Sequence, residues 1–411
     1  MLKRIITGTN VMIVIVLIIT GCGGNRKSNN RNEDINTVAP EDTIKTVALR
    51  DTFLTIDVTK KYPQKELKLQ DFMDVEYIPL ETTDEFVCQG AVVAIGKDIL
   101  LVRNIIRDGN IYVFYRNGLG LRKFNRMGQG PGEYLLYFDV FLDETNAEII
   151  IEESAFKKKL IYDLHGNFLR NIHKDDTRWF VARNFDDESL FCKDISYMME
   201  SKGADNQRFV LISKQDGSLV KDFRIYFKKR VEWGVTNRAG NAGGSPRLFP
   251  IVPYNDRWLL MEPSSDTIFC VLPDYSMTPF MARTPSIQSM KPAIFLLPCI
   301  FTERFYFMET VKMEYDFTRN EGFPKTHLAY DRLENTLFEY TVFNDDFLEK
   351  GPLDFTVQET SNSEIAFCQK LEAYELLEAY QKGQLKGKLK EIAAELEEES
   401  NPVIMLVKYK K

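Results

Sequence analysis

The residue types that most often carry chemistry are sparse in this sequence and do not share a catalytic or metal-binding spacing. No pair among the three histidines, His165, His173 and His327, has the spacing of zinc ligands. A Gly-x-Ser-x-Gly nucleophile motif is also absent from the sequence. Paired acids such as Asp186-Asp187 lie in polar segments, where such side chains usually cap the backbone of turns. The sequence therefore predicts no catalytic residue, no metal site and no cofactor.

A glycine-rich segment, Gly128-Gln129-Gly130-Pro131-Gly132-Glu133, superficially resembles a loop that cradles phosphate. A phosphate loop needs a helix after it, with Lys and Ser or Thr to complete the site. A strand-like stretch follows here instead, and Pro131 removes a backbone donor. We interpret the segment as a tight crossing whose glycines adopt positive φ. Arg126 and Glu133 remain candidate ligand-binding residues.

The segment Lys228–Pro250 is the strongest binding candidate in the chain. It is polar, rich in glycine and too long for a simple connection. Its ligand-binding candidates are Arg230, Trp233, Arg238 and Arg247, because an exposed Trp beside Arg suits a sugar or an anionic ligand. The alternative is a mobile insertion with Trp233 tucked beneath it.

The N-terminus has the order of features that targets a bacterial protein to the envelope. Lys3 and Arg4 precede an apolar run, Val11–Ile19, and the small residues Thr20 and Gly21 precede Cys22. Residues 18–22 resemble the bacterial lipobox, so we predict a signal peptide over 1–21 and lipidation of Cys22. Residues 22–50 are polar and predict a flexible tether. A plain signal peptide and an uncleaved anchor are the alternatives.

Composition and cysteine usage narrow the class of protein. A net charge of −7 with scattered basic residues makes nucleic acid an unlikely partner, and 44% hydrophobic residues are enough for a sizeable core. Five cysteines follow Cys22, and an odd number cannot pair completely. Cys192, Cys270 and Cys368 each follow an aromatic residue in a strand-like run. They therefore read as small buried hydrophobic residues.

The elements that would position these residues are short β-strands in a repeated unit. Residues 148–170 contain three short strands joined by turns, and variants of this unit recur to the C-terminus. Six runs look like one strand repeated, at a spacing close to that of propeller blades: Asn110–Phe114, Glu148–Ile151, Ser189–Cys192, Arg257–Met261, Arg304–Met308 and Glu364–Phe367. Residues 51–411 are therefore predicted to form an all-β, six-bladed β-propeller.

The last repeat departs from the pattern and suggests how the ring closes. Residues 371–399 are rich in Glu, Lys, Leu and Ala at helical spacing, which predicts a helical insertion in the last blade. Val403–Tyr409 then returns to strand. Pairing the two ends of the chain would remove open sheet edges. We therefore expect either Thr52–Val58 or Val75–Leu80 to complete the sheet that contains Val403–Tyr409.

Four motifs in order resemble the six-bladed, NHL-like β-propeller lipoproteins that Bacteroidetes encode in many copies. They are Val75-Glu76-Tyr77-Ile78-Pro79-Leu80-Glu81-Thr82, Asp108-Gly109-Asn110-Ile111-Tyr112-Val113, Gly128-Gln129-Gly130-Pro131-Gly132-Glu133-Tyr134 and Glu399-Ser400-Asn401-Pro402-Val403-Ile404. The resemblance implies a lipid-anchored propeller and supplies no catalytic residue. Exported surface lipoproteins of that phylum usually carry acidic residues after the lipidated Cys, whereas Gly23-Gly24-Asn25-Arg26-Lys27 follow here. The resemblance thus implies an outer-membrane lipoprotein facing the periplasm, with the cell surface as the alternative.

These observations predict a binding scaffold of the cell envelope. The membrane is the predicted partner through the lipid, and a glycan, a peptide or another envelope protein is the predicted ligand. The competing hypothesis is a propeller enzyme of lyase or lactonase type with a funnel active site, either with or without a metal. Three or more converging His, Asp or Glu side chains in the funnel would favour the enzyme. A funnel lined by aromatic and neutral groups would favour binding.

Overall fold

The computed structural model of the protein describes residues 53–105, 108–135, 137–153, 158–173, 180–194, 208–237, 240, 243–355 and 362–410. These residues belong to one structural unit. Cys22, the predicted signal peptide, the predicted tether and Arg238 lie outside the described residues.

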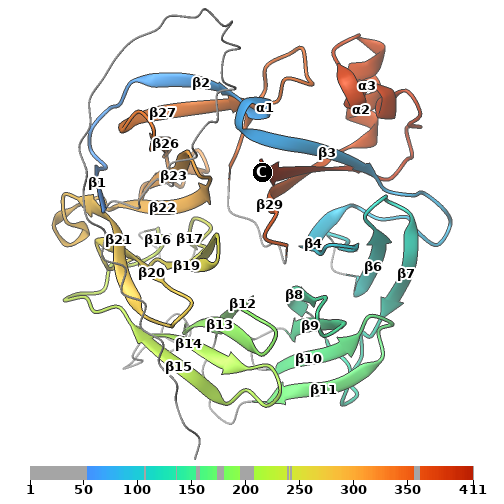
Figure 1. The fold of residues 1–411 in the computed structure, drawn as a ribbon, viewed down its shortest axis with the longest axis horizontal. Coiled ribbons are helices and arrows are strands. Elements are labelled where there is room, and N and C mark those ends of the chain that lie inside the picture. Colours follow the sequence, from blue (N-terminus) through green and yellow to red (C-terminus); the bar gives the residue numbers. More distant parts are fainter. Residues whose placement is uncertain are drawn as a thin grey trace, which may run out of the picture. The chain divides into compact units, whose positions relative to one another are not determined.

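Six mainly antiparallel sheets stand around a common axis and form a six-bladed β-propeller (Figure 1). The first three blades each have four strands, which follow one another in the sheet as they do in the chain. Blade one contains β4 (Ala91–Ile95), β5 (Ile99–Arg103), β6 (Asn110–Tyr115) and β7 (Gly120–Asn125). Blade two contains β8 (Tyr137–Asp143), β9 (Glu148–Glu153), β10 (Lys158–Asp163) and β11 (Phe168–His173). Blade three contains β12 (Phe180–Asn184), β13 (Ser189–Asp194), β14 (Arg208–Ser213) and β15 (Leu219–Arg224).

Blades four and five have the same core of four strands and carry additional pieces. Blade four contains β18 (Ile251–Tyr254), β19 (Arg257–Leu260), β20 (Thr267–Val271) and β21 (Met277–Thr284). Blade five contains β22 (Ile294–Phe301), β23 (Phe305–Lys312), β26 (Lys325–Asp331) and β27 (Thr336–Phe343), with β28 (Pro352–Leu353) paired to β27. The connections contain β16 (Val235–Thr236) with β17 (Gly243–Gly244), β24 (Tyr315–Asp316) with β25 (Glu321–Gly322), and the 3₁₀ helix η3 (Ile287–Ser289).

The sixth blade joins the two ends of the described chain. Its described strands are β29 (Ile365–Leu371), β30 (Val403–Tyr409) and β3 (Met73–Pro79), in that order. β3 pairs antiparallel with β30 along its whole length. Closure through Val75–Leu80 is therefore confirmed. The helices α2 (Ala373–Gln381) and α3 (Gly387–Ala393) lie between β29 and β30 in the chain.

The segment before β3 follows the outer edges of two other blades (Figure 1). β1 (Leu54–Asp57) pairs parallel with β21 of blade four, and β2 (Gln64–Lys68) pairs parallel with β27 of blade five. The short helix α1 (Leu69–Phe72) then leads into β3. Closure through Thr52–Val58 is therefore wrong. That stretch covers an exposed strand edge of blade four, where unpaired backbone groups would otherwise invite aggregation.

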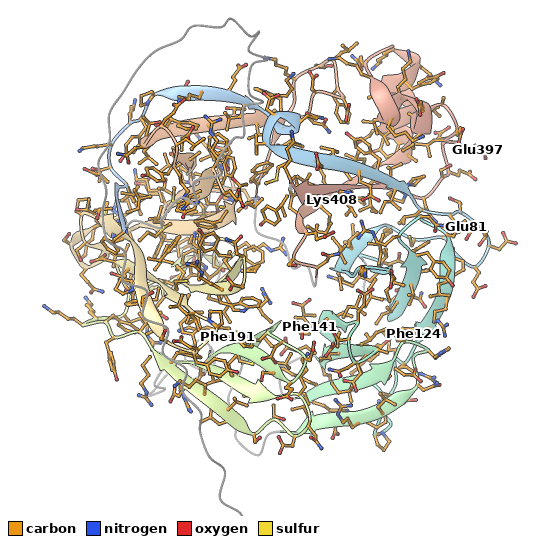
Figure 2. All side chains as sticks on the ribbon, viewed as in Figure 1. Glu81, Phe124, Phe141, Phe191, Glu397 and Lys408 are labelled. Atoms are coloured by element: carbon orange, nitrogen blue, oxygen red, sulfur yellow. The ribbon has the colours of Figure 1, made fainter. Side chains whose placement is uncertain are left out.

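The hydrophobic core lies between neighbouring blades, which explains why many strands are runs of apolar residues. Ile149 and Ile151 pack in a cluster shared with blade one, whereas Ile150 packs in a cluster shared with blade three. A strand that is buried on both faces needs apolar residues at every position. Phe141 and Phe191 lie in these packed layers, whereas Glu397 lies at the rim (Figure 2). The five cysteines after Cys22 are buried and form no disulfide with one another, which confirms that Cys192, Cys270 and Cys368 belong to the core.

Four of the six repeated runs are equivalent strands. The runs at Glu148, Ser189, Arg257 and Arg304 coincide with β9, β13, β19 and β23, the second strands of their blades. The run at Glu364 coincides with β29, the edge strand of the described sheet of blade six, whereas Asn110–Phe114 is the third strand of its blade. The equivalent strand of blade one is β5. The sequence pattern selected β6 instead of β5 because both strands are apolar, so the local pattern of residues did not distinguish them.

The alternation of strand direction gives the propeller two different faces. Turns between the first and second strands, such as 185–188 and 255–256, are short and lie on what we call the short-turn face. Connections between second and third strands and between blades lie on the opposite, long-loop face. These include the described residues of 225–237 and 243–250, together with 313–324 and 372–402. None of the helices in the described part of the chain is long and apolar enough to cross a bilayer.

Candidate ligand-binding pocket

A cavity of about 240 Å³ lies on the short-turn face where three blades meet. Its lining comes from blade three, from blade four and from the beginning of β29 and the end of β30 in blade six: Asn184, Phe185, Pro253, Asn255, Asp256, Trp258, Ser363, Ile365 and Tyr409. Blades three and six are opposite one another in the ring. The cavity therefore reaches across the propeller axis, where side chains from different blades can act on one ligand.

Two aromatic rings form one wall of this pocket. The ring centroids of Phe185 and Trp258 are 5.7 Å apart, at an interplanar angle of 31°. Both rings contact Phe191, which is fully buried between the blades. Phe191 therefore fixes the position of the wall from behind. Flat apolar rings held in this way suit the apolar face of a ligand that also has polar edges.

Planar amide groups supply the hydrogen-bonding part of the pocket. Asn184 ends β12, and its buried Oδ1 atom has no hydrogen-bond partner among the described residues. Asn255 occupies the turn between β18 and β19 with a φ of 53°, a left-handed conformation that Asn tolerates better than most residues. A buried acceptor without a partner carries a desolvation penalty of about 1–3 kcal/mol. A donor on a ligand would remove that penalty.

The pocket carries little net charge. Burial raises the pKa of Tyr409 to about 12, so its hydroxyl is neutral at physiological pH. Asp256 is the one carboxylate in the lining, and its Oδ1 atom lies 3.6 Å from Nε of Arg257. The pocket thus favours a neutral polar ligand over an anion or a cation.

Arg126 and Glu133 have structural positions outside this lining. Arg126 Nε donates to the carbonyl of Gly166 at 2.7 Å, which joins blade one to a turn of blade two. Glu133 Oε2 accepts from the amide of Gly130 at 2.8 Å. The loop is a tight crossing, but the expected reason is wrong because Gly128, Gly130 and Gly132 do not adopt left-handed φ values. Close approach is the reason at Gly132, since a Cβ there would lie 2.6 Å from Cγ of the Phe168 ring.

Trp233 is buried and anchors its own loop. Its side chain is only 9% exposed, its Nε1 donates to the carbonyl of Pro246 at 2.8 Å, and its ring lies edge-on to Phe295 at 4.7 Å. Trp233 is therefore buried within its own segment, and its role as a ligand-binding residue stays a prediction. The loop is also tied to blade four, because Val231 donates its amide to Ser264 Oγ at 2.9 Å.

Arg230 and Arg247 of the same loop lie near charged side chains of other blades. Lys193 forms a buried ion pair with Glu262. Burial lowers the pKa of Lys193, and the positive charge of Arg230 lowers it further. Arg247 stacks over Phe249 with 4.8 Å to the ring centroid. Arg230 is partly buried, whereas Arg247 is exposed.

A second charged group surrounds Asp139 of β8. Burial raises the pKa of Asp139, while Arg183, Arg103 and Arg247 oppose that effect. Arg183 Nη1 lies 3.9 Å from Asp139 Oδ2 and its guanidinium lies over Phe249. The positive charges of Arg183, Arg103 and Arg247 thus all favour the ionised form of Asp139.

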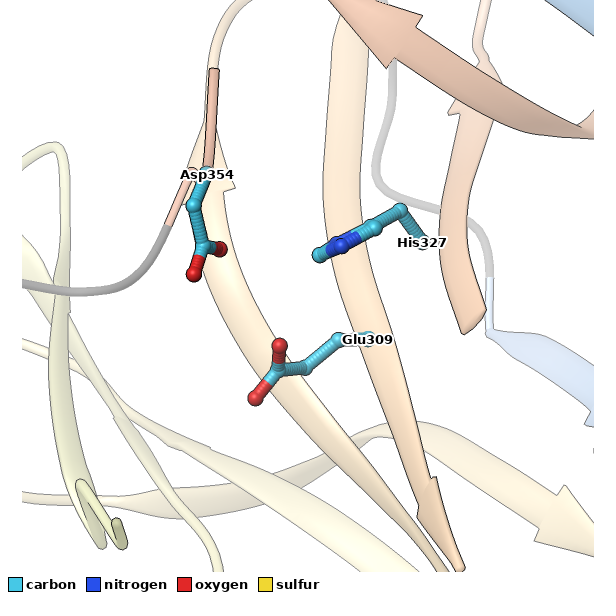
Figure 3. A group of neighbouring side chains, drawn as sticks. All are labelled: Glu309, His327 and Asp354. Atoms are coloured by element: carbon cyan, nitrogen blue, oxygen red, sulfur yellow. The ribbon is translucent and has the colours of Figure 1, made fainter. Parts of the chain in front are cut away.

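One group of possible metal ligands is brought together by the fold. Ligand atoms of Glu309, His327 and Asp354 all lie within 4.8 Å of one another in blade five (Figure 3). Glu309 and His327 are cross-strand neighbours on β23 and β26. The group does not line the cavity on the axis.

Both constellations were missed in the sequence because their members are far apart along the chain. The pocket draws on turns from three blades, and the Glu309 group draws on two strands and the residue after β28. The Asn255-Asp256 turn before Trp258 was a usable signal, since an aromatic residue beside a turn of Asn and Asp often faces solvent. No comparable signal marks His327.

Comparison with solved structures agrees with the propeller fold. A Bacteroides fragilis protein described as exported is similar over 88% of this chain and 100% of its own, with a TM-score of 0.58 and 17% identity. That likeness shows the fold alone. Virginiamycin B lyase from Staphylococcus aureus covers 65% of this chain and 88% of its own, with a TM-score of 0.31 and 9% identity. BamB from Moraxella catarrhalis covers 77% and 84%, with a TM-score of 0.32 and 8% identity.

Among curated proteins, none is similar in sequence to this chain. A family match nevertheless covers residues 53–408, which includes all six blades. By that match the chain belongs to the family described as a domain of unknown function, DUF4934.

Proposed function

We propose that this protein is an outer-membrane lipoprotein, anchored through Cys22 and facing the periplasm, whose propeller binds a neutral glycan in the pocket on the short-turn face. The N-terminal order of basic residues, apolar run, small residues and Cys22 supports the anchor. The cell surface is the alternative location, and an envelope protein or peptide is the alternative ligand.

The chemical character of the pocket is the observation that carries the binding role. It combines the rings of Phe185 and Trp258 with the amides of Asn184 and Asn255. A sugar has an apolar face of C–H groups and a rim of hydroxyls that both donate and accept. Aromatic rings suit the first feature, and amide groups suit the second because they offer both donors and an acceptor.

The competing enzyme hypothesis is less well supported by the same geometry. In the described residues, the one group of three converging His, Asp and Glu side chains lies within blade five, whereas the cavity across the axis is lined by aromatic rings, amides and a single carboxylate. A lyase or lactonase would need acid–base groups where the ligand binds. We therefore favour a binding scaffold.

The test of the glycan is a calorimetric titration of the detergent-solubilised full chain with maltohexaose, xylohexaose and chitohexaose. We expect one of the three to bind, and Asn255→Gly to weaken it about tenfold through loss of one hydrogen-bonding side chain. Gly tolerates the φ of 53°, so the turn is preserved. Asn335→Gly is the matched control, because Asn335 has a φ of 52° in a blade-five turn away from the pocket.

Trp258→Ala should abolish binding of the same sugar, with folding checked by thermal denaturation. If none of the three probes binds, or if Asn255→Gly and Asn335→Gly have equal effects, the proposed glycan site is wrong.

The anchor is tested separately with Cys22→Ser. Wild-type protein should fractionate with the outer membrane and carry the mass of an acyl-modified Cys22, whereas Cys22→Ser should be released in soluble form. Protease treatment of intact cells distinguishes the two locations, because a periplasm-facing protein is protected. An unmodified wild-type mass would exclude the lipoprotein.

A further inference from the structure

Three potential metal ligands in blade five point toward one shared space. Glu309 lies on β23 and His327 lies directly opposite on β26, while Asp354 follows β28 (Figure 3). One ligand atom from each side chain lies within 4.8 Å of the other two. A cation at the centre of such a triangle could contact all three side chains.

Two polar atoms at this place are buried and lack hydrogen bonds. Glu309 is 5% exposed, and its Oε2 atom has no hydrogen-bond partner among the described residues. The hydroxyl of Tyr340 on β27 is buried without a partner among the described residues as well. The rings of His327 and Tyr340 are 5.6 Å apart. Because buried polar atoms are normally satisfied, a ligand that interacts with these two atoms would remove an energetic cost.

A small cavity adjoins the carboxylate of this group. It measures about 20 Å³ and is lined in part by Glu309, Lys325 and Arg247, whereas His327 and Asp354 do not line it. A space of roughly 10–15 Å³ is enough for one water molecule. The cavity therefore admits a water molecule or a single ion next to Glu309, but no larger ligand.

Lys325 is the group that competes with a cation for Glu309. Its Nζ atom lies 3.0 Å from Glu309 Oε2, but the approach lacks hydrogen-bond geometry. The Lys325 side chain is 34% exposed, and the Glu309 side chain is 7% exposed. A long, partly solvated ammonium group can turn toward water when another cation takes its place.

We propose that Glu309, His327 and Asp354 bind a divalent transition-metal cation, with Zn²⁺ the best match. One imidazole nitrogen and two carboxylates form a donor set that suits Zn²⁺ better than Ca²⁺ or Mg²⁺, which prefer oxygen ligands throughout. Three protein ligands leave a coordination position for water. The proposed cation would connect β23, β26 and the segment after β28, and it is independent of the glycan pocket.

The experiment titrates Zn²⁺ into the metal-free, detergent-solubilised full chain by calorimetry in competition with a chelator. We expect one Zn²⁺ per chain. His327→Ala and Glu309→Gln should each weaken binding at least about tenfold, because each removes a direct ligand. His165→Ala is the matched control and should leave binding unchanged, since His165 lies on an exposed turn of blade two.

Lys325→Met provides a second, opposite readout. Removing the competing ammonium should tighten Zn²⁺ binding several-fold, which loss of folding cannot imitate. Thermal denaturation with and without Zn²⁺ should show metal-dependent stabilisation in the wild type and in Lys325→Met. Absence of stoichiometric binding, or unchanged affinity in both Glu309→Gln and Lys325→Met, would overturn the proposal.

Discussion

Val75 of β3 lies directly opposite Val407 of β30, so the first part of the ring is held by the last strand of the chain. β30 is the middle strand of its sheet and also pairs with β29. β3 belongs to blade six and continues in the chain into β4 of blade one, so its non-covalent pairing with β30 joins the first blade to the strands from the end of the chain. Ring closure therefore depends on the hydrogen bonds and apolar contacts of β30.

Deletion of residues 403–411 should abolish cooperative folding, because it removes the partner of both β3 and β29. Deletion of residues 1–60 is the comparison, since it removes β1 from the outer edge of blade four and leaves β3 in place. We expect the second variant to melt cooperatively, only at a lower temperature. Calorimetry measures both. If the variant that lacks residues 403–411 melted cooperatively at the wild-type temperature, the ring would have to close elsewhere.

Gly118→Ala should destabilise the closure seam strongly. A Cβ at Gly118 would lie 2.0 Å from the backbone carbonyl oxygen of Pro79 at the end of β3. Gly118 also has a φ of 89°, which by itself costs a non-glycine residue about 1–2 kcal/mol. Gly383→Ala is the control, because Gly383 has a φ of 67° with no atom near the added carbon. We expect Gly118→Ala to lower the free energy of unfolding by at least about 2 kcal/mol more than Gly383→Ala. Equal effects in urea denaturation would contradict the clash.

Trp233→Ala should destabilise the protein by about 3 kcal/mol, because a buried indole and its hydrogen bond to Pro246 are lost. The long loop should at the same time become more sensitive to limited proteolysis. Affinity for the pocket ligand should stay the same, since Trp233 does not line the pocket. A loss of affinity without a loss of stability would restore Trp233 as a ligand-binding residue.

Arg304→Gln should change how stability depends on pH. Burial would raise the pKa of Asp331, but hydrogen bonds from Arg304 and from the amides of Leu333 and Glu334 outweigh it and lower the pKa. A carboxylate with a lowered pKa stabilises the fold above its unfolded pKa, and this contribution is lost as pH falls through the folded pKa.

We therefore expect Arg304→Gln to cost about 1 kcal/mol at pH 7, a modest value because Arg304 is 46% exposed, and much less at pH 3. Urea denaturation at the two pH values measures the difference. Arg319→Gln is the control, because Arg319 is 74% exposed and 3.8 Å from Asp316, so its effect should be below about 0.5 kcal/mol at both. A difference that does not shrink at pH 3 would exclude Asp331 as the cause.

The sequence by itself determined the architecture, because strand propensity and repetition are local properties. Residues 148–170 predicted three strands, and β9, β10 and β11 lie there. Closure was narrowed to two segments, and the choice between Thr52–Val58 and Val75–Leu80 required the structure. Both are apolar and strand-forming, so only their packing partners, β21 and β30, distinguish them.

The sites were decided by the tertiary structure alone. Trp233 in a polar, glycine-rich loop had the local signature of a recognition residue. Its indole N–H nevertheless donates a hydrogen bond to the carbonyl of Pro246 within the same loop. Asn184, Trp258 and Tyr409 become one pocket only because blades three, four and six meet at the axis. Glu309 and His327 become neighbours only through the register of β23 with β26. Pairing between distant strands is a property of the closed ring, and no local pattern of residue types encodes which side chains it brings together.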